Sequence, residues 1–209
     1  MSENTVAGLM RELGLAARRK HKRKATTRPG RGRWRAPDLV KRDFGAPALN
    51  RRWFGDGTLI ATDEGRLHLV SVLDVASRRV LGFALGERHD AALAYGALAV
   101  AIAVRGGQVP GVVFHTGQGS EYTARSFQAA CQRLGVTQLM GRPDSVLDNA
   151  VIESWHSTLE SGLRQVEHFP TKQAARAKVA AWIEDHNTRR RHSACQMMPP
   201  VIYEKTLAA

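Results

Sequence analysis

Residues 53–85 read WFGDGTLIATDEGRLHLVSVLDVASRRVLGFAL. Three apolar segments, each separated from the next by a short polar group (TDEG, then ASR), lie at 53–61, 67–75 and 79–85. Short apolar runs joined by tight turns are typical of strands that pair with their neighbours in the chain in antiparallel fashion. The stretch therefore predicts an antiparallel meander of three strands.

The pattern changes after residue 85, because strand-like and helix-like segments begin to alternate. Helices are expected at 90–105 and 123–134, short strands at 111–115 and 135–140, and two longer helices at about 147–165 and 171–187. Strands that alternate with helices form sheets with helices packed on them. We therefore predict an α/β fold with a mixed five-stranded sheet flanked by helices.

Length and composition favour one globular domain with an appendage. The chain has 209 residues, of which 43% are hydrophobic, enough to form a core. Cys131 and Cys195 are too far apart in sequence for a CxxC zinc motif. The longest apolar run, at 91–104, is shorter than the roughly 20 residues that span a bilayer. The order of charges in the first residues reverses that of a secretory signal, so we expect a protein that is not exported and has no membrane partner.

The positive charge is concentrated at the N-terminus. Residues 1–52 contain 15 Lys/Arg and 4 Asp/Glu, a net charge of +11 out of +12 for the chain. Such a basic segment, rich in Gly and Pro, is expected to be an extended arm that contacts nucleic acid phosphates, with an aromatic side chain available for stacking on a base; a merely solvated tail is the alternative. The candidate DNA-binding residues of the arm are Arg18, Arg19, Lys20, Lys22, Arg23, Lys24, Arg31, Arg33, Trp34 and Arg35.

Four segments are expected along the chain: a short amphipathic helix in 1–17, the arm at 18–52, a core at 53–204 and a tail at 205–209. The first helix is too short for a domain and is interpreted as the remnant of an upstream helical DNA-binding region. The run Arg189, Arg190, Arg191 closes what is expected to be the last helix, where positive charge either caps the helix or binds a phosphate.

Two acidic residues are candidates for metal chemistry. Asp56 falls inside a predicted strand, where a carboxylate needs compensation, either from a divalent cation or from solvent at a sheet edge. Glu153 lies in a helix whose apolar stripe is predicted to be Val151, Trp155 and Leu159, so it points away from the core. It is either a metal ligand or an ordinary solvated glutamate. Asp148 beside it is interpreted as a helix cap.

Five blocks in order carry a resemblance to a known family. They are WFGD at 53–56, VLDVASRRVLGFAL at 72–85, HTGQGSEYTARSF at 115–127, GRPDSVLDNAVIESWHSTLE at 141–160 and WIEDHNTRRRHSACQMMPPVIYE at 182–204. The chain resembles the second-reading-frame transposases of bacterial family-three insertion sequences, whose catalytic core is similar to that of retroviral integrases. The resemblance implies an RNase H-like fold and a location in the bacterial cytoplasm, in association with the nucleoid. It also implies DNA transposition by a DDE site, in which Asp, Asp and Glu bind two Mg²⁺ or Mn²⁺ ions and phosphodiester bonds are cut and joined.

The resemblance places Asp56 and Glu153 at the first and third acids, as catalytic residues and metal ligands. The second acid belongs in a motif similar to H-[ST]-D-x-G-S-x-Y, where this chain has Gly117. Thirty-five residues separate Gly117 from Glu153, as the resemblance requires. We expect neither Gln118 nor Glu121 to replace the missing carboxylate. His115 and Asp74 are interpreted as structural residues, with Asp74 hydrogen-bonded to Ser77 or Arg78.

The missing acid leaves the activity open. One hypothesis is a transposase with impaired cleavage and strand transfer. The alternative is a catalytically dead remnant that still binds DNA, or a dominant-negative regulator that enters multimers with intact transposase. The expected partners are the DNA of insertion-sequence ends and targets, and either further copies of this chain or a related transposase.

Overall fold

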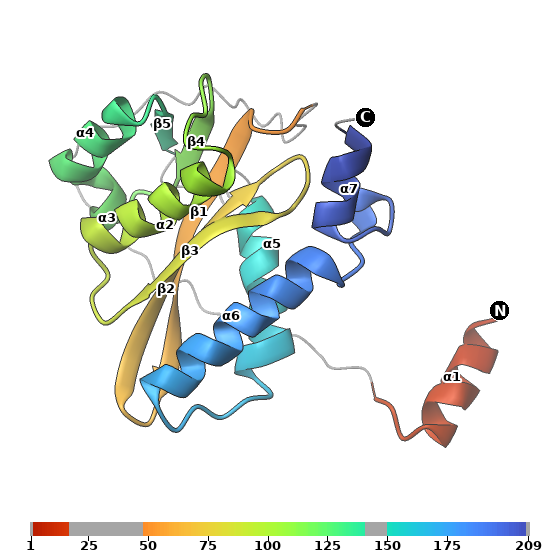
Figure 1. Cartoon of the computed structure of the whole chain (residues 1–209). Helices are drawn as coiled ribbons and strands as arrows, with labels where there is room; N and C mark the ends of the chain where they lie inside the picture. The colour runs from red at the N-terminus through yellow and green to blue at the C-terminus, as the bar shows by residue number, and fades with distance from the viewer. Residues whose placement is uncertain (1, 17–47, 141–149, 208–209) are drawn as a thin grey trace.

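The protein was analysed as a computed structural model that describes residues 2–16, 48–140 and 150–207 (Figure 1). Five strands form one sheet in the order β3-β2-β1-β4-β5. Their bounds are β1 Arg52–Thr62, β2 Gly65–Asp74, β3 Val80–Gly86, β4 Val113–Thr116 and β5 Thr137–Met140. The predicted RNase H-like order of three strands followed by alternating helices and strands is confirmed, and β1 is the central strand.

The meander forms because two turns reverse the chain in register. Strand β1 pairs with β2 from Trp53 opposite Asp74 to Thr62 opposite Gly65, and β2 pairs with β3 in the same antiparallel sense. Strands β4 and β5 then add in parallel on the other side of β1. Gly65 has a φ of 107°, so the first turn depends on a residue without a side chain.

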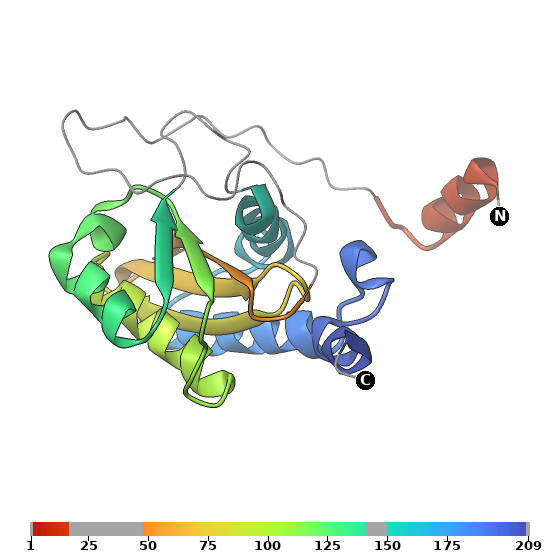
Figure 2. The ribbon, with the colours of Figure 1, turned by 90° about the horizontal axis from the view of Figure 1, so that it is seen from above.

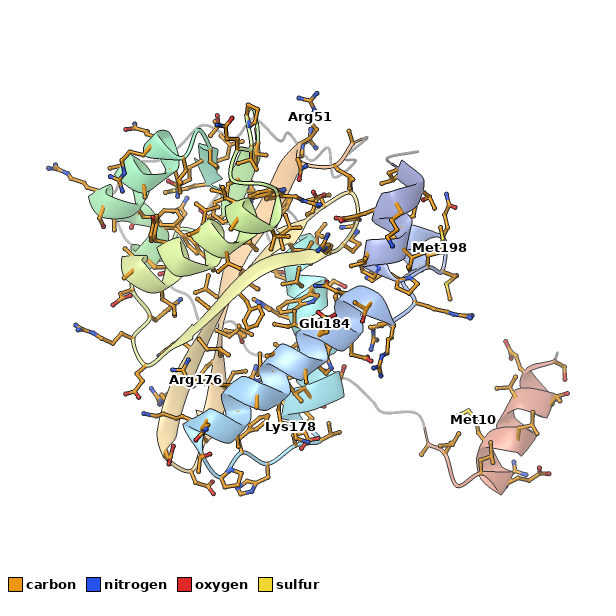
Figure 3. The ribbon with its side chains drawn as sticks, in the orientation of Figure 1. Met10, Arg51, Arg176, Lys178, Glu184 and Met198 are labelled. Carbon is orange, nitrogen blue, oxygen red and sulfur yellow. The ribbon has the colours of Figure 1, made fainter. Side chains whose placement is uncertain are left out.

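Helices cover both faces of the sheet. Their bounds are α1 Glu3–Glu12, α2 Ala91–Val104, α3 Ser120–Thr123, α4 Arg125–Arg133, α5 Ala150–Leu159, α6 Lys172–Thr188 and α7 Pro200–Leu207. One core cluster joins the sheet to α2, α3 and α4, and a second joins the opposite face to α5 and α6. Figure 2 shows α2 and α5 on opposite sides of the meander strands. The exposed side of α6 carries Arg176, Lys178 and Glu184 (Figure 3).

The structure corrects several expectations about the helices. On α5 the buried residues are Ile152, Trp155, His156 and Leu159, whereas Val151 is only half-buried. This helix continues as a π-helical turn, η2 (Glu160–Arg164). Helix α6 ends at Thr188 and is not the last, because α7 follows. Residues 147–149, including the proposed cap Asp148, lie outside the described residues, as does the arm from 17 to 47. In the described ranges, no helix combines the length and apolar character that crossing a membrane requires.

A buried ionic cluster ties α7 to the sheet. The Glu204 carboxylate on α7 accepts hydrogen bonds from Ser77 Oγ, Arg79 Nη1 and Arg105. Arg105 also reaches the Asp74 carboxylate, with 3.4 Å between Nη2 and Oδ2. Asp74 is structural as predicted, but its side chain accepts from the backbone N–H groups of Asn50 and Ala76 rather than bonding to Ser77 or Arg78.

His186 joins α6 to the sheet and to α5. Its ring stacks on the indole of Trp182 and meets the indole of Trp155 edge to face, and its Nε2 donates to the carbonyl oxygen of Arg78 at 3.1 Å. Burial lowers the pKa of His186 to about 4, and the charges of His192 and Arg190 act in the same direction. The ring is therefore neutral in the folded protein near pH 7.

Acid should destabilise this protein partly through His186. Between the ordinary histidine pKa of 6.5 and the folded value near 4, the unfolded chain binds the proton and the folded chain does not, so stability falls as the pH falls. The shift corresponds to a loss of up to about 3 kcal/mol. Chemical denaturation of His186→Asn at pH 7 and pH 5 is expected to show a flatter pH dependence than the parent. Equal slopes for the two proteins would contradict this prediction.

Candidate functional site

Asp56 lies on the central strand β1, opposite Ser71 on β2. It is not on an edge strand, so exposure to solvent at a sheet edge does not explain a carboxylate at this position. His156 Nδ1 lies 3.2 Å from Asp56 Oδ2, and because a carboxylate only accepts, the ring nitrogen donates. His156 Nε2 lies 3.2 Å from Ser71 Oγ. These two contacts hold the imidazole and orient the Asp56 carboxylate, as an outer histidine orients a metal ligand.

Glu153 comes to the same place from helix α5. Its side chain is exposed, on the side of α5 away from the buried Trp155, as predicted. The part of its carboxyl group that faces the protein is still desolvated, which raises the pKa of Glu153; the negative charge of Asp56 raises it further, and His156 lowers it. Two carboxylates from β1 and α5 therefore act on each other electrostatically, which is the expected behaviour of acids that share one site.

Gly117 follows β4 directly, and the strand register places it beside Asp56. Thr116 at the end of β4 pairs in parallel with Gly55, so the next residue of each strand lies at the same level. A Cβ atom built on Gly117 would meet no atom within 4 Å, and its φ is outside the left-handed region. Nothing in the described surroundings therefore requires glycine, and the space for a longer side chain is open.

Glu121 is held by other contacts on helix α3. Its carboxylate is only 6% exposed, lies directly over Gly119 and is 3.4 Å from His89 Nε2. The ring of His89 stacks on His68 from β2, with centroids 5.2 Å apart. Burial raises the pKa of Tyr122 well above its ordinary value, and Asp56 and Glu121 add to this effect. Glu121 is thus near the site but is engaged with a histidine.

The donors available for a metal ion at this site are the carboxylates of Asp56 and Glu153. Among the described residues, no group of three or more His, Cys, Asp or Glu side chains has a metal-binding arrangement. Asp56 and Glu153 are oxygen donors of the kind that Mg²⁺ and Mn²⁺ prefer, and two carboxylates suffice for one such cation with water or phosphate as further ligands. These two residues therefore have the donor chemistry of ligands for a divalent cation, and Gly117 supplies no side-chain oxygen.

The proximity of the Asp56 and Glu153 carboxylates should lower the stability of the folded protein. Because the folded-state pKa of Glu153 is raised, the penalty of holding it ionised is present above that pKa and disappears as the pH falls toward the ordinary value of 4.5. Glu153→Gln is expected to melt at a higher temperature than the parent at pH 7 without divalent metal, and at the same temperature at pH 4. Scanning calorimetry at both pH values measures this, and a lower melting temperature at pH 7 would exclude it.

Other predicted site residues lie elsewhere. Arg189, Arg190 and Arg191 are exposed just beyond α6, and Arg189 Nη1 is 3.9 Å from Asp185. The arm residues Arg18, Arg19, Lys20, Lys22, Arg23, Lys24, Arg31, Arg33, Trp34 and Arg35 lie outside the described residues. His115 is buried in β4 against Phe54, with ring centroids 4.8 Å apart.

Sequence reasoning missed His156 and His89. His156 follows Glu153 by three positions on α5, and residues three apart share a side of a helix, so the spacing offered a signal. His89 gave no such signal, because its place depends on the turn between β3 and α2 and on Gly57, where a side chain would collide with its ring.

Comparisons with known proteins identify a family and relatives that this chain is similar to. Two family profiles, both described as Integrase core domain, match residues 46–145 and 134–200. The transposase for insertion sequence element IS904 of Lactococcus lactis is 35% identical over 202 residues, covering 96% of this chain and 79% of that protein. Transposase InsF for insertion sequence IS3A of Escherichia coli is 35% identical over 206 residues, covering 98% and 71%.

Solved structures share the fold. A chain of the simian T-cell lymphotropic virus intasome in complex with a PP2A regulatory subunit superposes with a TM-score of 0.63 at 18% identity, over 85% of this chain and 60% of that one. The HTLV-2 integrase catalytic core domain in complex with magnesium, in its trimeric form, gives 0.56 at 15% identity, over 75% and 97%. At these identities the similarity concerns the fold alone.

Proposed function

The chain belongs to the insertion-sequence transposases that have an integrase core domain, and from that premise we propose that it binds DNA and that its phosphodiester cleavage and strand transfer are impaired by Gly117. The observation that carries the proposal is the geometry of three positions. Asp56 and Glu153 interact electrostatically, while the neighbouring strand end at Gly117 offers space and no ligand. The catalytic roles of Asp56 and Glu153 are part of this proposal.

Asp56 and Glu153 would hold a divalent cation, with His156 fixing the orientation of the Asp56 carboxylate. When bound, such a cation polarises the phosphodiester and stabilises charge on the attacking and leaving oxygens. With one carboxylate absent, the remaining pair supplies less negative charge and fewer oxygen contacts. Weak metal affinity and slow DNA cleavage follow.

The absence of a carboxylate at Gly117 also supports a second function. A chain that binds DNA and joins multimers without cutting would occupy insertion-sequence ends and inhibit an intact relative. Oligomers are plausible for this fold, since the HTLV-2 integrase core is described in dimeric and trimeric forms. A transposition assay with a related active transposase, with and without this chain, distinguishes inhibition from residual activity.

DNA binding itself should be strongly salt-dependent. Lys and Arg contacts to phosphates release counterions, and the basic segment 18–35 supplies enough cations for several contacts. Affinity for a labelled duplex is expected to fall by at least about a hundredfold between 50 and 200 mM salt. Deletion of 1–47 should weaken binding and flatten this dependence, and Asp56→Asn should not. A deletion variant with unchanged binding would contradict the assignment of the arm.

A further inference from the structure

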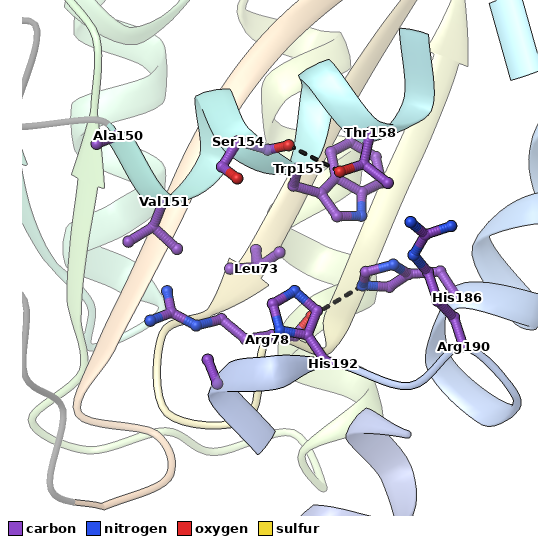
Figure 4. Close-up of a pocket in the computed structure, with 11 residues that line it drawn as sticks. Leu73, Arg78, Ala150, Val151, Ser154, Trp155, Thr158, His186, Arg190 and His192 are labelled. Atoms are coloured by element: carbon purple, nitrogen blue, oxygen red, sulfur yellow. Dashed lines mark hydrogen bonds between the residues drawn. The ribbon is translucent and has the colours of Figure 1, made fainter. Parts of the chain in front are cut away.

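A cavity with basic and hydroxyl side chains in an otherwise apolar wall lies on another side of α5 from Glu153 (Figure 4). Its volume is about 370 Å³, within the range of ligand pockets. It is bounded by α5, the turn between β2 and β3, the end of α6 and the segment that follows. The polar side chains in its wall are Arg78, Ser154, Thr158, His186, Arg190 and His192. Among the described residues of this wall there is no acid.

Arg78 is the residue that most needs a ligand. It is half-buried, and burial lowers its pKa, an effect that the nearby Cys195 and Asp74 only partly offset. Within the described part of the chain its guanidinium has no hydrogen bond or ion pair, since the only bonds found involve its backbone. Its neighbour Arg79 is, by contrast, paired with Glu204. An unpaired, half-buried guanidinium facing a cavity is the expected mark of an anion site.

The backbone also holds Arg78 in an uncommon conformation. Its φ is 60°, in the left-handed region where residues with side chains are rare. Such residues often mark functional positions, where the fold tolerates the strain for the sake of a side chain's placement. The Arg78 carbonyl is at the same time fixed by His186 Nε2. The arginine is therefore presented to the cavity by a rigid turn.

Arg190 is the other cation in the wall of this cavity. Arg190 follows the end of α6, and no partner for its guanidinium is found in the described ranges. Burial is the largest cause that lowers the pKa of His192, and the positive charges of Arg78 and Arg190 lower it further. The two positive fields therefore overlap at one ring. In Figure 4 the rings of His192 and His186 lie between Arg78 on the left and Arg190 on the right, below the α5 residues Ser154 and Thr158.

We propose that this cavity binds a phosphate group of the DNA backbone, with Arg78 and Arg190 as the charged donors and Ser154 as a hydroxyl donor. Several N–H and O–H groups from different directions suit a tetrahedral oxyanion. Ser154 follows Glu153 in the chain, so the cavity adjoins the carboxylate site around the same helix. A phosphate held there would position the strand whose neighbouring bond meets Asp56 and Glu153. The inference rests on the proposed DNA binding.

The test compares charge-matched variants of the full chain in DNA binding across salt concentrations. Arg78→Asn removes the cation but keeps a residue that tolerates a left-handed φ, and Arg190→Gln removes the second cation. Each is expected to bind a labelled duplex roughly tenfold more weakly and to lower the slope of log K against log salt by about 0.9. Arg78→Lys should retain the slope. Arg133→Gln, an exposed change of equal charge on α4, is the control and should match the parent.

A second measurement uses inorganic phosphate without DNA. At constant ionic strength, phosphate should raise the melting temperature of the parent more than that of Arg78→Asn. If Arg78→Asn and Arg190→Gln bind DNA like Arg133→Gln, the inference is overturned. If phosphate still raises the melting temperature of the parent more than that of Arg78→Asn, the cavity binds a free anion instead of a DNA phosphate. If the parent shows no salt-dependent DNA binding, the proposed function fails. If phosphate then raises the melting temperatures of the parent and of Arg78→Asn equally, the cavity is not an anion site either.

Discussion

Gly117→Asp is expected to raise metal-dependent DNA cleavage by more than about a hundredfold, since losing even an outer residue of a metal site costs 10- to 100-fold. The new carboxylate would stand beside Asp56, where β4 ends level with Gly55. The substitution should be tolerated sterically, because a Cβ at this position meets no atom within 4 Å and the φ suits any residue. Strand cleavage and joining with Mg²⁺ or Mn²⁺ on cognate-end DNA measures the effect.

Metal binding gives a second readout that does not depend on DNA. A third carboxylate near two others adds repulsion, so Gly117→Asp should melt at a lower temperature than the parent without metal and gain more from added Mn²⁺. Gly117→Asn has a similar shape without the charge and serves as the control. If the parent already cleaves, and Asp56→Asn abolishes this cleavage, Gly117 does not impair the site and another residue supplies the missing ligand.

Arg105→Met is expected to destabilise the fold by about 3–5 kcal/mol, the usual cost of removing one partner from a buried ion pair. Arg105 lies between the carboxylates of Asp74 and Glu204, and its side chain is only 11% exposed. Burial alone raises the pKa of Glu204, but hydrogen bonds from Arg105, Arg79 and Ser77 outweigh it and leave the pKa lowered. Burial leaves the pKa of Asp74 raised despite its partners. Without Arg105, both acids lose their compensating charge.

Urea unfolding at pH 7 measures this loss, and Arg88→Met is the matched control. Arg88 is 89% exposed and 4.0 Å from Asp90, so its removal should change stability by less than about 1 kcal/mol. Because the Glu204 pKa is lowered in the folded state, its contribution is present above the ordinary carboxyl pKa and is lost as the pH falls through the folded value. An Arg105→Met protein as stable as Arg88→Met would show that the cluster contributes nothing net.

The sequence predicted the sheet because its signals were local. The meander follows from apolar runs separated by TDEG and ASR, and the helix at 91–104 begins at Asp90, whose side chain caps it. Asp56 and Glu153 were found through their motifs, and the position of Gly117 through its spacing. These features depend on chain neighbours or on short-range geometry.

What could not be predicted depends on contacts between distant residues. The partner of Asp74 is Arg105, and Glu204 bonds to Ser77 across 127 positions. Val151 looked like part of the apolar stripe, yet Ile152 is buried instead, because the orientation of α5 is set by packing against α6 and β1 rather than by its own periodicity. The place of Arg78 depends on a left-handed backbone conformation in its turn, which the local sequence does not predict.

The long reach of the Glu204 cluster has a consequence for synthesis on the ribosome. The acid and the cation that neutralise each other, Glu204 and Arg105, are 99 positions apart, so Arg105 leaves the exit tunnel long before its second partner is made. Until then the β2–β3 turn and the end of α2 have an incomplete set of charges. Contacts between such distant residues form late and slow the search for the native state. The nascent core should therefore stay sensitive to protease until α7 emerges and closes the cluster.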